Sequence, residues 1–231
     1  MNNVSEFFGK LGKYSGWALL ISPWILFLIC YLLTPKKWVL TKNALSDFGS
    51  PEFTKYYLVY NVGLIVLAII MWMMSLGIVA RARNKVQVFG GAFWFVAGIF
   101  LALIGYYHEG TYPHVFVSTW FFVQGALAIG IMGIGAYPEH DLKASVIQIL
   151  TAIFMPSGVM IVHFPSAATV EIYEIAVMDV WLIFYLLYNP LKKPVQVEKT
   201  ESSSKRDAIV VGTLATILFA LGAIVIAFVF K

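Results

Sequence analysis

The chain has 231 residues, of which 60% are hydrophobic and only 12% carry a charged side chain. Soluble domains carry about 25% charged residues, so this composition excludes a water-soluble domain as the main body and predicts an integral membrane protein. The formal net charge is +4. Because the basic residues flank apolar segments instead of forming a patch with interleaved aromatic residues, we expect no nucleic-acid partner.

Continuous apolar stretches, each long enough to cross a hydrocarbon core of roughly 30 Å as a helix, recur along the chain. In chain order they cover residues 14–33, 57–79, 86–107, 114–136, 144–163, 168–188 and 208–230. A membrane barrel would instead show segments of about ten residues that alternate polar and apolar side chains. The predicted fold class is therefore all-α: a polytopic membrane bundle of seven transmembrane helices, a six-helix core and one extra C-terminal helix.

A polar segment separates the last apolar stretch from the others. Residues 189–207 contain two prolines and a run of three serines, which is typical of a flexible linker. We therefore divide the chain into a six-helix transmembrane core over 1–188, a polar cytoplasmic linker over 189–207 and a seventh transmembrane helix over 208–231. Within the lipid bilayer, this seventh helix is expected to pack at the periphery or to contact a membrane-protein partner.

Lysine and arginine are distributed unevenly between the two sides of the predicted bundle. Eleven lie in the N-terminal segment and in every second loop, and five lie on the opposite side. The positive-inside rule then predicts a cytoplasmic N-terminus. We expect the cell membrane, the plasma membrane of a prokaryote, as the location. The outer face would carry the loop 34–56 and the turns 108–114 and 163–166.

The first outer loop ends in a pattern typical of a helix start. Ser50 suits the N-cap position, Pro51 the first helical position, and Glu52 is favoured by the helix dipole. We therefore expect the second helix to run from Pro51 to about Val79. Its first turns should project beyond the outer side of the membrane, or the helix should tilt.

Short motifs in this loop and in the next outer turn resemble a known family. Ser46-Asp47-Phe48-Gly49 follows the first span, and Gly105-Tyr106-Tyr107-His108-Glu109 precedes Pro113-His114. Together they resemble the integral membrane proteins of domain-of-unknown-function family 998, over residues 14–188. The family's usual Ser-Asp-Leu-Gly reads Ser-Asp-Phe-Gly here, and the seventh span exceeds the usual six. The resemblance implies a helical bundle without an established activity and singles out Ser46, Asp47, Gly49 and His114.

Imidazole and carboxylate side chains gather on the predicted outer face. They suit a divalent metal such as zinc, although their spacing matches no established metal motif. Hydrated or hydrogen-bonded histidines at helix ends are the alternative, and haem ligation is a weaker one. The candidate metal ligands are His108, His114 and His163; the candidate ligand-binding residues are Ser46, Asp47, Glu109, Glu171, Glu174 and Asp179.

The sixth stretch carries three acidic residues, Glu171, Glu174 and Asp179. From a start near Ala168, a rise of about 1.5 Å per residue puts Asp179 roughly 16 Å deep, near the midplane. Acidic residues at that depth are functional candidates by default. The structural alternative for Asp179 is an interhelical hydrogen bond with a tyrosine or Gln124.

Glycines at positions 91, 98 and 105 recur every seven residues and predict a stripe along which the third helix approaches a neighbour closely.

For function, we expect an outward-facing cavity that binds a metal, a lipid headgroup or a small ligand. Three alternatives stay open: an accessory subunit of a membrane complex, a membrane-embedded metal-assisted hydrolase, and a small proton-linked transporter.

Overall fold

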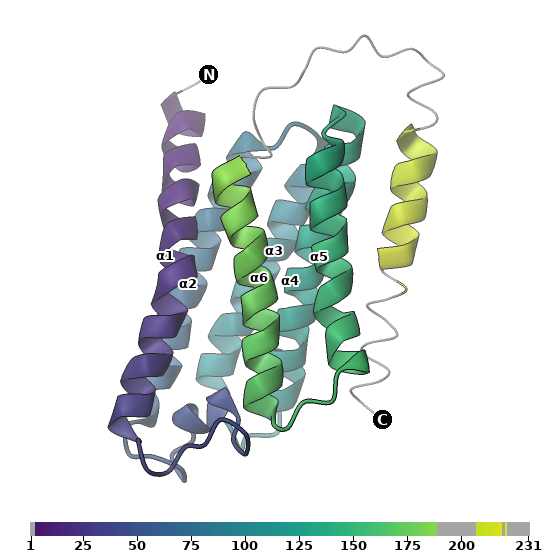
Figure 1. Cartoon of the computed structure of the whole chain (residues 1–231). Coiled ribbons are helices and arrows are strands. Elements are labelled where there is room, and N and C mark those ends of the chain that lie inside the picture. Colours follow the sequence, from purple (N-terminus) through teal and green to yellow (C-terminus); the bar gives the residue numbers. More distant parts are fainter. Residues whose placement is uncertain (1–2, 189–206, 219, 221–231) are drawn as a thin grey trace.

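The computed structural model describes residues 3–188, 207–218 and 220; their regular elements are all helices, with no strand among the described residues. Six long helices pack side by side, and successive helices run in opposite directions (Figure 1). They are α1 (Asn3–Leu33), α2 (Tyr57–Arg81), α3 (Lys85–Tyr106), α4 (His114–Ala136), α5 (Leu142–Ile161) and α6 (Ala167–Tyr188), with short 3-10 helices η1 (Leu45–Gly49) and η2 (Tyr137–Glu139). The predicted all-α bundle is confirmed for the described residues.

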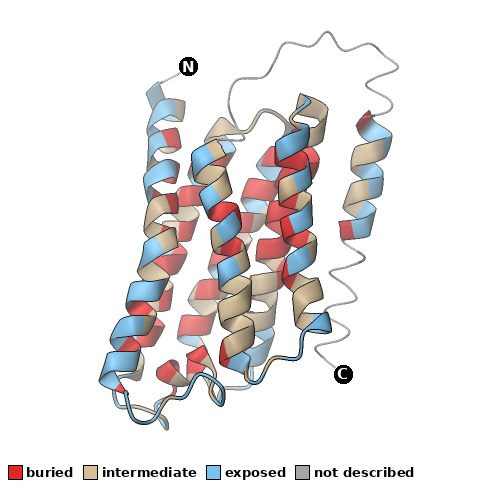
Figure 2. Ribbon diagram, in the orientation of Figure 1, coloured by how far each residue is buried: buried red, intermediate tan, exposed pale blue. Residues whose placement is uncertain are grey.

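Five of the described helices are long and apolar enough to cross a membrane: α1, α2, α3, α4 continued by η2, and α5. Their outward-facing sides expose large hydrophobic side chains, such as Ile25 (51%) and Leu28 (56%) on α1. Figure 2 shows this pattern, with buried residues facing the interior of the bundle. Exposed apolar faces of this extent suit a lipid environment and not water. The chain is thus a multi-pass membrane protein.

Two predicted segments are described only in part. A helix over Asp207–Leu218 represents the beginning of the predicted seventh span. The predicted linker 189–207, apart from its last residue, and the remainder of the seventh span, apart from residue 220, lie outside the described residues.

The predicted glycine stripe of α3 faces α2. A Cβ atom added at Gly91 would lie 2.8 Å from Val79 Cγ2, and one at Gly98 would lie 2.7 Å from Trp72 Nε1. At Gly105 it would lie 2.4 Å from the main-chain oxygen of Asn61. These distances are shorter than van der Waals contact, so glycine lets the two backbones approach as closely as they do.

α6 lies between α1 and α5 and covers the inner side of α3 and α4 (Figure 1). Its buried side chains anchor it at mid-length: the ring of Trp181 lies 4.7 Å from that of Trp94, centroid to centroid. The Trp181 indole also donates a hydrogen bond to Gln148 on α5, at 3.2 Å. This bond satisfies two buried polar groups at once, as the interior of a membrane bundle requires.

The predicted start of the second helix at Pro51 is wrong, because α2 begins at Tyr57. One turn does form after Ser50, whose main-chain oxygen accepts hydrogen bonds from the N–H groups of Phe53 and Thr54. The helix does not continue, because the Thr54 hydroxyl accepts from the Tyr56 N–H. Side chains that compete in this way for main-chain groups end a helix early.

Replacing Gly105 by alanine is expected to lower the free energy of unfolding by about 1–3 kcal/mol, because the new methyl group would collide with main-chain atoms of α2. Unfolding in mixed detergent micelles measures the change. The matched control is Gly212→Ala in the C-terminal helix, where an added Cβ meets nothing within 4 Å. An equal loss of free energy of unfolding in Gly105→Ala and Gly212→Ala would contradict close packing of α3 on α2.

Candidate functional site

The loop between α1 and α2 folds back under the bundle and closes one end of it. Two side chains of η1 insert between the helices: Leu45 is 3% exposed and Phe48 is 2% exposed. Phe48 stacks on Trp38 with ring centroids 5.0 Å apart. Near the start of α6, Ser166 donates to the Leu40 oxygen at 2.6 Å. These contacts hold η1 in a defined position relative to the helices.

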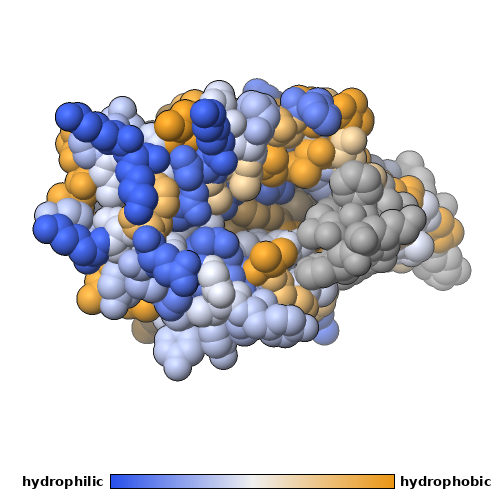
Figure 3. All heavy atoms as spheres, turned by 90° about the horizontal axis from the view of Figure 1, so that it is seen from below, coloured by the Kyte–Doolittle hydropathy of each residue, from blue (hydrophilic) through white to orange (hydrophobic). Residues whose placement is uncertain are grey.

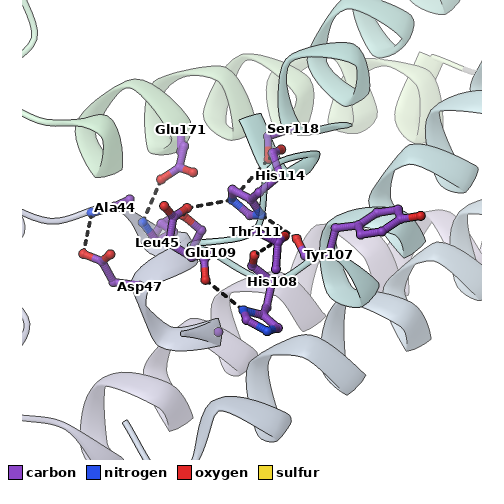
Figure 4. Close-up of polar contacts among 12 residues, drawn as sticks. Ala44, Leu45, Asp47, Tyr107, His108, Glu109, Thr111, His114, Ser118 and Glu171 are labelled. Carbon is purple, nitrogen blue, oxygen red and sulfur yellow. Dashed lines mark hydrogen bonds and ion pairs between the residues drawn. The ribbon is translucent and has the colours of Figure 1, made fainter. Parts of the chain in front are cut away.

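Glu109 links this loop to the turn between α3 and α4. One oxygen of its carboxylate lies 2.9 Å from the Ser46 hydroxyl of η1 and 2.9 Å from Nε2 of His114, the first residue of α4. Figure 4 shows the Glu109 and His114 side chains pointing toward one another, next to Leu45 of η1. Residues more than sixty positions apart therefore meet at a single carboxylate.

The surroundings of His114 favour its doubly protonated form. Its Nδ1 lies 2.7 Å from the main-chain oxygen of Tyr107, and its Nε2 lies 2.9 Å from the Glu109 carboxylate. Both nitrogens thus face acceptors, and only an imidazolium can donate to both. The hydrogen bond from His114, aided by that from Ser46, lowers the pKa of Glu109 to about 2, although partial burial opposes this shift. The contact is accordingly a charged pair.

Asp47 has a local role at the start of η1. Its carboxylate accepts hydrogen bonds from the Asn43 side chain at 2.7 Å and from the Ala44 N–H at 3.0 Å. The Asn43 main-chain oxygen in turn accepts from the N–H of Ala168 at 2.9 Å. Asp47 therefore shapes the loop that presents Ser46.

Glu171 is the acidic residue of α6 that lies next to this cluster. Its carboxylate accepts a hydrogen bond from the Leu45 N–H at 2.7 Å (Figure 4). In the described part of the chain, no lysine or arginine forms an ion pair with Glu171, Glu174 or Asp179. One side of Glu171 is thus held by the loop, and the remainder faces open space within the bundle.

Two cavities flank α6, and Glu171 lines both. The first, about 100 Å³, lies among α1, α2, α3, α4 and α6, and its mostly apolar wall includes Asp179. The second, about 260 Å³, lies among α4, α5 and α6 and includes Glu174 and Leu218. Figure 3 looks onto this end of the molecule, where hydrophilic residues gather on one side and the surface beside them is hollowed over apolar residues.

Asp179 lies deeper in the bundle than the other acidic residues. Its carboxylate accepts a hydrogen bond from the indole N–H of Trp24 on α1, at 2.8 Å. This is an interhelical bond of the kind expected from the sequence, but its donor is a tryptophan and neither a tyrosine nor Gln124. It joins α1 to α6 beside the first cavity.

The three candidate metal-ligating histidines do not share one position. The ring of His108 points to the adjacent main-chain oxygen of Glu109, at 2.8 Å, while His114 contacts the Glu109 carboxylate. His163 is exposed on the connection between α5 and α6. Among the residues that the structure describes, no group of three or more His, Cys, Asp or Glu side chains is arranged to hold a metal ion. A metal here stays a prediction.

Comparison with known proteins identifies the family. The family described as "Protein of unknown function (DUF998)" matches residues 19–188 of the chain. The chain belongs to this family. No curated protein and no solved structure matches it.

The positions that the DUF998 resemblance singles out have structural roles in this member. Ser46 and His114 both bind Glu109, and Asp47 stabilises the loop that carries Ser46. Gly49 lies against α2, where an added Cβ would be 2.3 Å from the side-chain oxygen of Asn61. The motif residues therefore build one closed end of the bundle.

Several contributors to the site carry no signal in the sequence. The Leu45 N–H and the Tyr107 oxygen are main-chain groups, and Trp24 is one of seven tryptophans in the chain. The sequence predicted an interhelical hydrogen bond for Asp179, but with a tyrosine or Gln124 as the partner and not with Trp24.

Replacing Glu109 by glutamine is expected to lower the free energy of unfolding at neutral pH by about 1 kcal/mol, the difference between a charged and a neutral hydrogen bond. Because the pKa of Glu109 is lowered from 4.5 to about 2, its stabilising effect is complete above pH 4.5 and is lost as the pH falls to 2. Unfolding in detergent, measured between these pH values, should show that the variant loses less free energy of unfolding on acidification than the wild-type protein does.

The control for this prediction is Glu52→Gln, which removes an exposed carboxylate at the same end of the bundle. The free energy of unfolding of this control variant should depend on pH in the same way as that of the wild-type protein. If Glu109→Gln and the wild-type protein lose stability in parallel on acidification, the pair with His114 is not the acid-sensitive contact.

Proposed function

We propose that this DUF998 member binds a small amphipathic ligand that carries a cationic or hydrogen-bond-donating group. Its apolar part would occupy the cavities beside α6, and its polar group would meet the Glu171 carboxylate. The single observation that carries the proposal is that Glu171 lines both cavities and forms no ion pair in the described part of the chain.

The chemistry of the cavity walls supports this ligand class. A carboxyl group surrounded by apolar side chains is costly to bury unless it is paired or hydrogen-bonded. The Leu45 N–H supplies one hydrogen bond to Glu171, and an ammonium or hydroxyl group of a ligand would supply the remainder. Aromatic and aliphatic walls with a few polar groups are typical of small-molecule sites.

The arrangement in the membrane is part of the same proposal. α6 has 22 residues, which at about 1.5 Å per residue is long enough to span the hydrocarbon core despite its three acidic residues. With the C-terminal helix, the count would reach seven spans, and the excess of basic residues in the N-terminal segment and every second loop supports a cytoplasmic N-terminus in a prokaryotic plasma membrane. The closed end with Glu109 and Glu171 would then face outward.

Dodecylamine is expected to bind the protein in nanodiscs more tightly than dodecanoate does, because only the amine can pair with Glu171. Glu171→Gln should weaken dodecylamine binding about tenfold or more, since loss of one partner of a buried charged contact costs 2 kcal/mol or more. Isothermal titration against loaded and empty nanodiscs separates specific binding from partition into lipid.

Two further variants sharpen this test. Ile175→Trp, which fills part of the first cavity, should also weaken dodecylamine binding, whereas Glu52→Gln on the exposed loop should not. Equal binding of the amine and the carboxylate, or no effect of Glu171→Gln, would contradict the proposal.

A further inference from the structure

A third, polar recess lies at the opposite end of the bundle, where α1, α2 and α6 meet. Its volume is about 140 Å³, room for roughly four or five waters. Lys13 from α1, Arg81 from α2 and Tyr185 from α6 contribute its polar wall. This recess shares no residue with the two cavities that flank Glu171.

Glycines shape this recess. A Cβ added at Gly12 would lie 2.6 Å from the Cα of Gly77, so α1 and α2 are in main-chain contact here. One turn earlier, a Cβ at Gly9 would lie 2.4 Å from Nε of Arg81. The missing side chain at Gly9 therefore lets the Arg81 guanidinium lie against α1, in the same recess that Lys13 lines.

The charged side chains that line the recess are basic. Of the described residues that line it, two are cationic and none is acidic. In the part of the chain that the structure describes, the Arg81 side chain donates to no protein acceptor within hydrogen-bond distance, although a guanidinium carries five N–H donors. The C-terminal end of α2 adds a partial charge of about −0.5, which two full positive charges outweigh.

We propose that this recess binds a phosphate group, supplied by the headgroup of an anionic membrane phospholipid. A guanidinium binds phosphate oxygens in a bidentate manner, and a lysine ammonium adds a second positive charge. The recess lies at the end of apolar helices, and nearby side chains of α1, such as Phe7 (61% exposed) and Tyr14 (71% exposed), present apolar surface for acyl chains. A lipid headgroup therefore fits this position better than free phosphate, which would use the two cations alone.

Native mass spectrometry of the delipidated full chain tests the proposal with three probes: dioleoylphosphatidylglycerol, dioleoylphosphatidylcholine and inorganic phosphate. Phosphatidylglycerol should bind at least about tenfold more tightly than phosphatidylcholine, whose own cation offsets its phosphate. Lys13→Gln and Arg81→Gln should each weaken phosphatidylglycerol binding several-fold. Lys13 is exposed, so its replacement leaves folding intact even if that of Arg81 does not.

Lys10→Gln is the matched control, because it removes the same charge from α1 at a site where Lys10 pairs with exposed Glu6 at 2.9 Å. It should retain full phosphatidylglycerol binding. Equal affinity for the two lipids, or an equal loss in Lys10→Gln and Lys13→Gln, would overturn the proposal. If inorganic phosphate displaces phosphatidylglycerol from the recess, the inference that a lipid headgroup supplies the phosphate group is wrong.

Discussion

The Glu109 carboxylate holds together parts of the chain that are otherwise independent. It accepts a hydrogen bond from Ser46 in the first loop and pairs with His114 at the start of α4. A loop at the end of a membrane bundle has many main-chain groups to satisfy and little regular structure with which to do so. The charged contact between His114 and Glu109 joins this loop to the turn before α4, and it adds to the packing of Leu45 and Phe48 that positions η1.

α6 has a different character from the helices around it. The glycine stripe of α3 brings that helix into main-chain contact with α2, whereas α6 has a cavity on each side. Its three acidic residues explain this difference, because carboxylates cannot pack tightly among apolar side chains without a donor. Leu45 and Trp24 supply a donor to Glu171 and to Asp179, respectively. The less tightly packed helix is thus also the one that carries the polar groups available to a ligand.

The two ends of the bundle differ in chemistry. At one end, Glu109 pairs with His114 and Glu171 binds the adjacent loop; at the other, Lys13 and Arg81 line a recess shaped by glycines of α1. An anionic lipid at the basic end and an amphipathic ligand beside the acidic residues would use opposite charges at separate sites. Such a division suits a protein that is fixed in one orientation in a membrane.

The sequence by itself determined the class of fold, the long apolar helices and the glycine stripe, because each depends on local composition or on a helical period. It also identified Glu109, His114 and Ser46 as candidates, although their mutual contact was not among its predictions. The tertiary structure decided that α2 begins at Tyr57. The preceding turn ends because the Thr54 hydroxyl accepts from the Tyr56 N–H and the Lys37 ammonium donates to the Phe53 main-chain oxygen. It also decided that Glu171 binds the Leu45 N–H and that Trp24 is the partner of Asp179. These contacts join residues 126 and 155 positions apart, and distance along the chain leaves no local pattern from which to predict them.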